Sequence, residues 1–290
     1  MTAEPGDRRR ILIAGASAGI GAALVEALAT DGHAVFACAR RAEPLRRATR
    51  GDTLARSQVC DVSDEAQVVN LFRWVGEHTD ALDGLILCAG SFGAIGPLAE
   101  TDSDAWWATL RGHVFGAYLM VKHGLPLLER GARPRILTFS GGGAFGTFPR
   151  YSAYATSKAA VVRLTECMAD ELRPRGITVN AVAPGMVATE IHKATLEAGP
   201  EKAGAEHYER TRTAMTVGAV PMEVPVACVR FLLSRAADGL TGKTISASFD
   251  PWRKPAFGAH VAEIVQSEVY TMRRINPAHL PDGPLKELLS

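Results

Sequence analysis

The side chains best suited to chemistry in this 290-residue chain are a tyrosine and a lysine four positions apart, Tyr154 and Lys158. On a helix, residues four apart lie on one face, so a phenol and an ammonium can be held toward a common point. A phenol has a pKa of about 10 in water, and a neighbouring cation lowers that pKa by stabilising the phenolate. The pair therefore suits acid–base catalysis, with a packed tyrosine beside a solvated lysine as the plain alternative.

A glycine-rich turn lies far upstream of this pair. It follows an expected strand at 10–14 and opens a helix, and its glycines permit a tight turn with close backbone approach. The free N–H groups and the positive dipole end of the helix suit a pyrophosphate. We expect a dinucleotide here and hydride transfer near Tyr154, with a simple strand-to-helix turn as the alternative. The residues of the turn expected to contact the coenzyme are Gly15, Ser17, Gly19, Ile20 and Gly21.

The end of the second expected strand indicates which dinucleotide binds. In such folds an acidic residue near this point bonds the ribose 2′-hydroxyl, whereas an arginine accommodates a 2′-phosphate. Ala39 stands where the acid would be, and Arg40 and Arg41 follow it. A guanidinium matches the geometry of a phosphate. The sequence thus favours NADP(H) over NAD(H), with a solvated pair of arginines as the alternative.

Short apolar runs alternate with helix-length segments along most of the chain. Runs that are apolar on both faces indicate parallel strands covered by helices. We therefore expect an α/β fold of the Rossmann type, a doubly wound sheet of seven parallel strands in a single domain over residues 1–249. The expected strands are 10–14, 34–38, 57–60, 84–88, 135–139, 177–182 and 243–246, and the expected helices are 19–30, 64–77, 102–128, 152–173 and 221–234.

Two segments depart from this alternation. Residues 186–220 have weak helical periodicity, and we interpret them as a substrate lid over the strand ends, with a plain surface excursion as the alternative. Residues 250–290 are too few for a domain. We expect them to form a C-terminal extension packed on its own subunit or on a neighbouring one. It contains an amphipathic segment at 261–272, followed by Pro277, Pro281 and Pro284.

The composition argues against several classes of protein. The chain is 47% hydrophobic and 22% charged with a net charge of +1, which gives no broad basic surface for nucleic acid or an anionic membrane. No apolar run reaches the ~18 residues of a transmembrane helix, so we expect a cytoplasmic protein. The histidines lack metal-ligand spacing, so no metal is expected. The cysteines, which we expect to be buried thiols, are Cys38, Cys60, Cys88, Cys167 and Cys228.

In order and spacing, these motifs resemble those of the short-chain dehydrogenase/reductases over residues 10–248. The resemblance also rests on Cys60-Asp61-Val62, Cys88-Ala89-Gly90, Val179-Asn180, Pro184-Gly185 and Thr189. It implies a nicotinamide coenzyme and the interconversion of a ketone and a secondary alcohol on a small metabolite. It also implies that Asp61 and Val62 touch the adenine. By the same likeness Ala89 and Gly90 line the coenzyme channel, and Thr189 holds the nicotinamide end. The further coenzyme contacts that we expect are Pro184, Gly185 and Val187, with Tyr154 and Lys158 themselves.

Two positions depart from that family's pattern. The family's catalytic serine stands thirteen residues before the tyrosine, where this chain has Gly141, and Ser140 lies one position early. Either a local shift brings the Ser140 hydroxyl to the substrate carbonyl, or Ser140 points into the sheet and backbone N–H groups remain. His113 stands where the family has an asparagine that supports a water-linked proton path. With an ordinary pKa of about 6.5, it would orient that relay, donate a proton, or be a hydrogen-bonded core residue.

The leading hypothesis is an NADP(H)-dependent oxidoreductase. In it Tyr154 protonates the forming alkoxide and Lys158 lowers the pKa of that tyrosine. His113 links Lys158 to solvent, and Ser140 or the Gly141 backbone polarises the carbonyl. The missing serine also admits a cofactor-retaining epimerase or dehydratase, a non-catalytic nucleotide-binding homologue, or a structural subunit whose site has decayed.

The family likeness implies a homodimer or homotetramer paired through the helices at 102–128 and 152–173. The apolar side chains on these helices are Trp106, Trp107, Phe115, Tyr118, Val161, Val162, Leu164 and Met168. The substrate is expected to be a small molecule, and no motif identifies it. Residues considered for its pocket are Met186, His192, Trp252, Phe257 and Tyr270.

Overall fold

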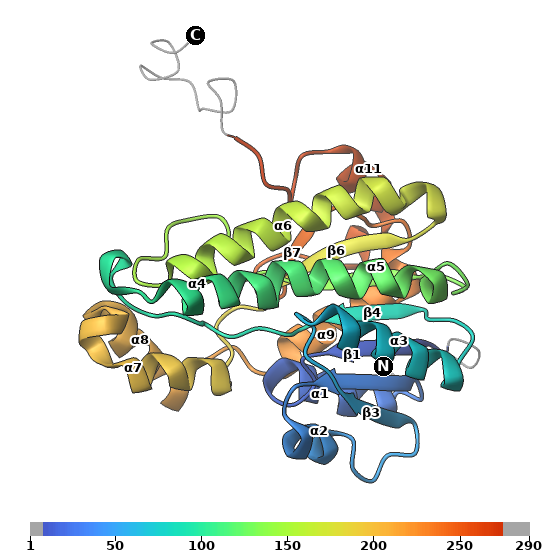
Figure 1. Ribbon diagram of the computed structural model, residues 1–290. Coiled ribbons are helices and arrows are strands. Elements are labelled where there is room, and N and C mark those ends of the chain that lie inside the picture. Colours follow the sequence, from blue (N-terminus) through green and yellow to red (C-terminus); the bar gives the residue numbers. More distant parts are fainter. Residues whose placement is uncertain (1–7, 275–290) are drawn as a thin grey trace, which may run out of the picture.

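One parallel sheet of seven strands organises the protein, and the computed structural model describes residues 8–274 (Figure 1). The strand order is β3-β2-β1-β4-β5-β6-β7, so the chain winds outward in both directions from the centre of the sheet. This confirms the predicted Rossmann-type, doubly wound α/β fold. The strands are β1 (Arg10–Ala14), β2 (Ala34–Ala39), β3 (Ala55–Val59), β4 (Gly84–Leu87), β5 (Arg135–Phe139), β6 (Thr178–Ala183) and β7 (Thr244–Ser246).

The inner strands are apolar on both faces because each face of the sheet carries its own core, whereas the edge strand β3 is polar and only partly buried. Along β1, Ile11 and Ile13 belong to one hydrophobic cluster, while Leu12 and Ala14 belong to the other. Successive side chains of a strand point to opposite faces, so a strand buried on both sides must be apolar at every position. This burial is what made the strands recognisable in the sequence.

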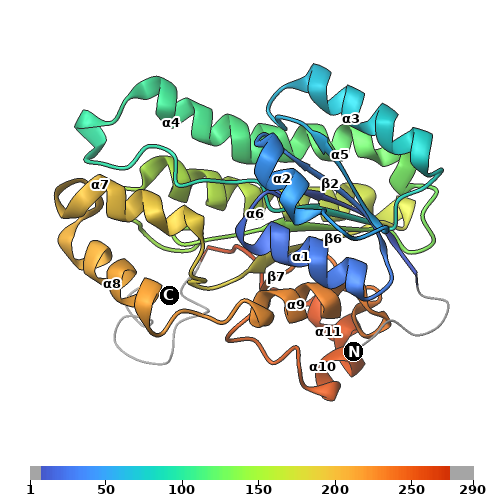
Figure 2. The ribbon, with the colours of Figure 1, turned by 90° about the horizontal axis from the view of Figure 1, so that it is seen from below.

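Helices cover the two faces of the sheet (Figure 2). Side chains from α1 and α9 enter the first cluster, and side chains from α3, α5 and α6 enter the second. The first turn of α3 is capped by Asp64 and that of α4 by Asp102, whose carboxylates each accept a backbone N–H bond. The helices are α1 (Gly19–Thr30), α2 (Ala42–Ala48), α3 (Glu65–His78), α4 (Ser103–Leu110), α5 (Gly116–Leu128), α6 (Ser152–Leu172), α7 (Lys193–Ala203), α8 (Ala205–Thr216), α9 (Glu223–Leu233), α10 (Pro255–Ala259) and α11 (Val261–Gln266).

The helix expected over 102–128 is not a uniform α-helix. A π-helical turn at Arg111–Phe115 separates α4 from α5, and the three segments follow one another without a loop. A π turn inserts one extra residue into the helix and changes the direction of the side chains there, and such turns are frequent at functional sites. Sequence periodicity did not show it because the apolar stripe continues on both sides.

Residues 186–220 contain two helices, α7 and α8, that the weak periodicity did not place. They lie beyond the strand ends, at the same end of the molecule as α4 (Figure 1). Val187 and Val220 form an isolated parallel bridge at the base of the segment. The Tyr151 hydroxyl, just before α6, donates to Thr195 Oγ1 of α7 at 2.9 Å. The segment is therefore joined to the main body at its base and through α7.

The described part of the C-terminal extension packs on its own chain. Phe257 and Val261, from α10 and α11, are buried in the cluster on the α1 and α9 side. Farther on, the Tyr270 carbonyl accepts a bond from Thr244 N at 2.8 Å, and Met272 N donates to Glu166 Oε1 of α6 at 2.6 Å. The amphipathic segment expected at 261–272 is helical only as far as Gln266. The three prolines that follow it lie outside the described residues.

The cysteines fulfil the expectation of buried thiols only in part. Cys38, Cys60 and Cys228 are buried, Cys88 is half-buried, and Cys167 is exposed on α6. Cys167 corrects the expectation: its helix packs on the sheet by one face only, and apolar neighbours in the sequence do not specify which face a residue takes. No helix within residues 8–274 is long and apolar enough to cross a membrane.

Candidate active site

The glycine-rich turn fits tightly against the loop that follows β4. Gly15 has φ +83°, and a Cβ there would lie 2.4 Å from the backbone nitrogen of Ala89. A Cβ on Gly21 would lie 2.3 Å from the Gly15 carbonyl oxygen. Both positions therefore require glycine, which lets the start of α1 approach the carboxyl ends of β1 and β4. In an open α/β sheet, ligands bind in the crevice outside these strand ends, at the point where strand order reverses.

The two arginines after β2 have different surroundings. Arg41 donates to Glu190 at 2.8 Å and to Ser17 Oγ at 3.3 Å, so it spans the glycine turn and the segment after β6. The neighbouring guanidinium lowers the pKa of the Glu190 carboxyl. Arg40 is exposed and has no hydrogen-bond or ion-pair partner within residues 8–274. Arg40 is thus the arginine available to a ligand.

The other residues expected to contact a coenzyme lie at the ends of β3, β4 and β6. Asp61 follows β3 and accepts bonds from Ser63, and the neighbouring Val62 is buried. After β6, the side chain of Thr189 lies 3.2 Å from where a Cβ on Gly19 would be. The structure therefore brings the predicted set to one edge of the sheet, around the glycine turn. The members after β4 and β6 are Ala89, Gly90, Pro184, Gly185, Val187 and Thr189.

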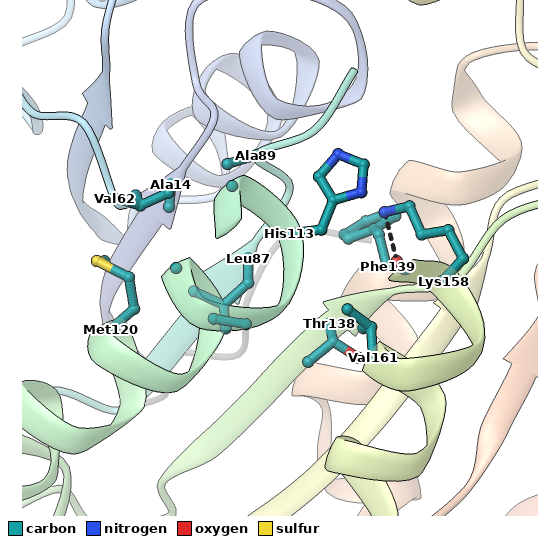
Figure 3. Close-up of a pocket in the computed structure, with 13 residues that line it drawn as sticks. Ala14, Val62, Leu87, Ala89, His113, Met120, Thr138, Phe139, Lys158 and Val161 are labelled. Carbon is teal, nitrogen blue, oxygen red and sulfur yellow. Dashed lines mark hydrogen bonds between the residues drawn. The ribbon is translucent and has the colours of Figure 1, made fainter. Parts of the chain in front are cut away.

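Tyr154 and Lys158 lie in the first two turns of α6, on its buried face. The Lys158 ammonium donates to the Phe139 carbonyl at the end of β5 at 2.9 Å, and it lies 5.5 Å from the centroid of the Tyr154 ring. Figure 3 shows Lys158 beside His113, which comes from the π turn. The four-residue spacing thus places phenol and ammonium close together, as predicted.

The pKa values differ from the expectation of a phenol made acidic by its lysine. Burial raises the pKa of Tyr154 well above its usual value, and burial also lowers the pKa of Lys158 to about 8. Desolvation disfavours the charged form of each group, and it is the largest cause of both shifts. Tyr154 is therefore a protonated phenol in this structure, which is the form that donates a proton.

Gly141 lies against the hydroxyl end of Tyr154 with no room for a side chain. A Cβ at position 141 would lie 2.2 Å from the Tyr154 hydroxyl oxygen. Ser140 is buried after β5, and its hydroxyl has no partner within the described residues. The tyrosine hydroxyl thus occupies the place where the side chain of the family's serine would begin. Ser140 is one residue before that position, and its hydroxyl has no hydrogen-bond partner within the described residues.

His113 is buried and hydrogen-bonded at both ring nitrogens. Its Nε2 accepts from the backbone N–H of Ser91 at 3.0 Å, and its Nδ1 is 2.6 Å from Ser157 Oγ. Burial and the nearby charges of Lys158 and Arg40 hold the pKa of His113 well below its ordinary value. A cavity of about 20 Å³ is lined by residues including His113 and Lys158 (Figure 3). It is large enough for one water molecule, and its lining includes Gly112, His113, Gly116, Thr138, Phe139 and Lys158.

Aromatic side chains gather around Tyr154, and of them the sequence indicated only His192 as a pocket candidate. Phe92 meets the Tyr154 ring edge-on at 4.8 Å between centroids, and Phe148 does so at 6.3 Å. His192 packs against Phe92 at 5.4 Å. Phe92 and Phe148 lie in irregular loops with no periodicity, so only their place after β4 and β5 could have indicated them. Of the pocket candidates, Trp252, Phe257 and Tyr270 pack instead with the α9 cluster.

Comparison with known proteins identifies the family. A model of the short chain dehydrogenase family matches residues 9–199. The chain belongs to this family. Membership places it among the NAD(P)-dependent oxidoreductases that act on alcohol and carbonyl groups. It also explains why the glycine turn and the Tyr154–Lys158 pair occur together.

Individual relatives agree with this assignment. The chain is 35% identical over 193 residues to a short chain dehydrogenase of Monascus purpureus, a match covering 63% of this chain and 66% of that protein. It is 30% identical over 251 residues to a putative ketoacyl reductase of Streptomyces coelicolor, covering 83% and 95%. The structure of an actinorhodin polyketide ketoreductase variant with NADPH superposes with a TM-score of 0.74 at 27% identity, covering 84% and 97%.

Within residues 8–274, no group of three or more histidine, cysteine or acidic side chains is arranged to hold a metal ion.

Proposed function

We propose that this short-chain dehydrogenase uses NADP(H) to interconvert a ketone and a secondary alcohol on a small molecule. The observation that carries the proposal is the position of Tyr154, a protonated phenol beside a buried lysine at the strand ends that adjoin the glycine turn. A structural relative is described with NADPH, and a sequence relative is named a ketoacyl reductase. Both names agree with carbonyl reduction.

The residues at the strand ends fit a dinucleotide. The bare glycine turn leaves no room for a Cβ at Gly15 or Gly21, and its helix start provides N–H groups for a pyrophosphate. Arg40, which is exposed and unpartnered within the described chain, would pair with the 2′-phosphate. This favours NADP(H). Asp61 and Val62 would hold the adenine end, and Thr189 the opposite end.

The bound coenzyme supplies the hydride. Tyr154 would donate its proton to the oxygen of the forming alkoxide, since its phenol is protonated near pH 7. Lys158, fixed by its bond to the Phe139 carbonyl, would stabilise the phenolate left behind. The Gly141 backbone or the unpartnered Ser140 hydroxyl would polarise the carbonyl. His113 would hold the loop after β4 to α6 rather than donate a proton, because its two ring nitrogens bond Ser91 and Ser157.

Residues 186–220 would serve as the lid of this site. Their helices pack against the aromatic residues before α6, since His207 of α8 lies 4.8 Å from Phe148 and 5.0 Å from Tyr151 between ring centroids. Burial and Arg210 lower the pKa of His207 to about 4, so it is neutral near pH 7. The lid side of the site, with His207 against Phe148 and Tyr151, is thus aromatic and uncharged, which favours a substrate with apolar groups around its carbonyl.

The test is the loss of NADPH absorbance with a panel of apolar ketones, run in parallel with NADH. We expect stoichiometric oxidation of NADPH and formation of a secondary alcohol. An isomerised product without net coenzyme change would instead identify an epimerase. Failure to bind either coenzyme would overturn the proposal.

A further inference from the structure

We propose that His113 is a positioning residue that ties the loop after β4 to the catalytic helix α6, as a neutral ring carrying its proton on Nδ1. The inference rests on the proposed function only in what the tie accomplishes, since the hydrogen bonds that define it belong to the protein alone. It differs from a role as titrating member of a proton relay.

The Ser91 contact fixes one nitrogen of the ring. A backbone amide nitrogen can only donate, so Nε2 of His113 must accept through its lone pair at 3.0 Å and carries no proton. A neutral imidazole then has its proton on Nδ1. The Ser91 N–H therefore determines which nitrogen of His113 carries the proton.

Ser157 completes a row of hydrogen bonds that can run in only one direction. Nδ1–H of His113 donates to Ser157 Oγ at 2.6 Å, and the Ser157 hydroxyl donates to the Tyr154 carbonyl oxygen at 2.7 Å. This row of hydrogen bonds begins at the Ser91 N–H and ends at the Tyr154 carbonyl. If every bond in it ran the other way, a proton on His113 Nε2 would face the Ser91 N–H. Protonation of the ring would create the same conflict. Both alternatives are unfavourable in a buried site.

The local fold is arranged around this ring. The π turn at 111–115 presents His113 inward, where it is 6% exposed. A Cβ on Gly90 would lie 3.1 Å from His113 Nε2 and 3.6 Å from Lys158 Nζ, so Gly90 passes close to both side chains. An ordinary side chain at position 90 would press on the ring.

The charges around the ring disfavour a second proton. Lys158 of α6 and Arg40 at the end of β2 both lower the pKa of His113, in addition to burial. The Tyr154 ring, also from α6, lies 5.8 Å away and is protonated. The nearby Cys88 thiol of the β4 loop is neutral too, because burial raises its pKa. No anion therefore faces the ring from these elements to favour the imidazolium.

These hydrogen bonds link the glycine turn, through the loop after β4, to the catalytic helix α6. Ala89 packs on Gly15 of the glycine turn, while Ser91 is held through His113 and Ser157 to the helix of Tyr154 and Lys158. The loop between Ala89 and Ser91 therefore sets the spacing between the coenzyme turn and the proton donor. Loosening it should weaken coenzyme binding more than it slows the chemical step.

Three substitutions test the Ser91 and Ser157 hydrogen bonds of His113 one at a time and together. His113→Gln places an amide oxygen near the Nε2 position and can keep the Ser91 bond, whereas His113→Asn places an amide nitrogen near Nδ1 and can keep the Ser157 bond. His113→Phe keeps the ring and neither bond. We expect the dissociation constant of NADPH to rise about threefold to tenfold for each single-bond variant and more for His113→Phe. The KM for NADPH should rise more than kcat falls. His123→Gln, on α5 directly after the π turn, is the matched control.

Two readouts decide the inference. Long-range ¹H–¹⁵N spectra of the coenzyme-free protein, assigned by comparison with His113→Gln, should show the Nδ1–H tautomer unchanged from pH 5.5 to 8. An Nε2–H tautomer, or protonation near pH 6.5, would overturn it whether or not the protein is active. In the kinetics, an ionisation between pH 6 and 7 that His113→Gln abolishes would also overturn it. If NADPH does not bind to the native protein, the proposed function fails, and the spectra alone decide the tautomer.

Discussion

The hydroxyl oxygen of Tyr154 lies 2.2 Å from where the first side-chain atom of residue 141 would be, so Gly141 and Tyr154 fill one place between them. Non-bonded contacts this short essentially never occur at a Cβ atom. Any residue other than glycine at position 141 must move the tyrosine or the loop. The absence of the family's serine is thus linked to the position of the proton donor.

Restoring the family's serine should therefore harm the enzyme. We expect Gly141→Ser to lower kcat about 100-fold, because a displacement of about 1 Å at a reacting group costs that much. Gly142→Ala is the matched control, since its Cβ would meet only Phe148 at an ordinary 3.4 Å and should leave kcat unchanged. The measurement is steady-state kinetics with NADPH and a ketone. A rise in kcat for Gly141→Ser would show that the hydroxyl matters more than the tyrosine position.

Removing the phenol should stop the chemistry without disturbing the fold. Tyr154→Phe keeps the ring between Phe92 and Phe148 and deletes only the hydroxyl, so we expect kcat to fall about 10²- to 10⁴-fold. The dissociation constant of NADPH and the melting temperature should stay close to those of the native protein. Tyr118→Phe, at an exposed position of α5, serves as control. Unchanged turnover in Tyr154→Phe would remove the tyrosine from the mechanism.

Activity should decline as Lys158 loses its proton. Burial lowers its pKa to about 8 in the coenzyme-free protein, so the ammonium is present below that pH and is lost above it. An anionic coenzyme binds the charged form better, and kcat/KM for NADPH reports ionisations of the free enzyme. We expect that ratio to fall above pH 8. Lys158→Arg, which keeps its charge, should give a flat profile at a lower level. A native profile that is flat to pH 10 would contradict this.

The two arginines after β2 should differ in their effects on coenzyme choice. We expect Arg40→Ala to raise the KM for NADPH about 10-fold or more and to leave that for NADH nearly unchanged, because a charged hydrogen bond to the 2′-phosphate is lost. Arg41 is paired with Glu190, so Glu190→Gln frees it and should tighten NADPH only a few-fold, as expected for an exposed ion pair. Arg46→Ala is the control. An equal rise in KM for NADPH and for NADH in Arg40→Ala would argue against the 2′-phosphate contact.

The exposed aromatic residues of α4, the π turn and α5 should lie in a subunit interface. Trp107 is 58% exposed, and the stacked pair Phe115 and Tyr118 are 40% and 46% exposed. Exposed apolar groups gathered on neighbouring turns mark interaction surfaces. We expect Trp107→Glu combined with Tyr118→Glu to reduce the molecular mass in analytical ultracentrifugation to that of a monomer. Val217→Glu, also at an exposed apolar position, should not change it. A native protein that is already monomeric would rule out the interface.

The sequence by itself determined the sheet, the glycine turn and the spacing of Tyr154 and Lys158. Each of these follows from local physics: strands buried on both faces must be apolar throughout, a tight turn against β4 needs glycine, and residues four apart share a helix face. The proposed preference for NADP(H) rests on the same kind of signal, since Arg40 directly follows the end of its strand.

Only the tertiary structure decided what surrounds these residues. The bond between His113 and Ser91, the pair of Arg41 and Glu190, and the approach of Tyr154 to Gly141 each join segments distant in the chain. The π turn that presents His113 adds one residue to a helix whose apolar pattern does not change. Likewise, the pKa of Lys158 depends on how deeply packing removes its ammonium from water, which spacing along the chain does not specify.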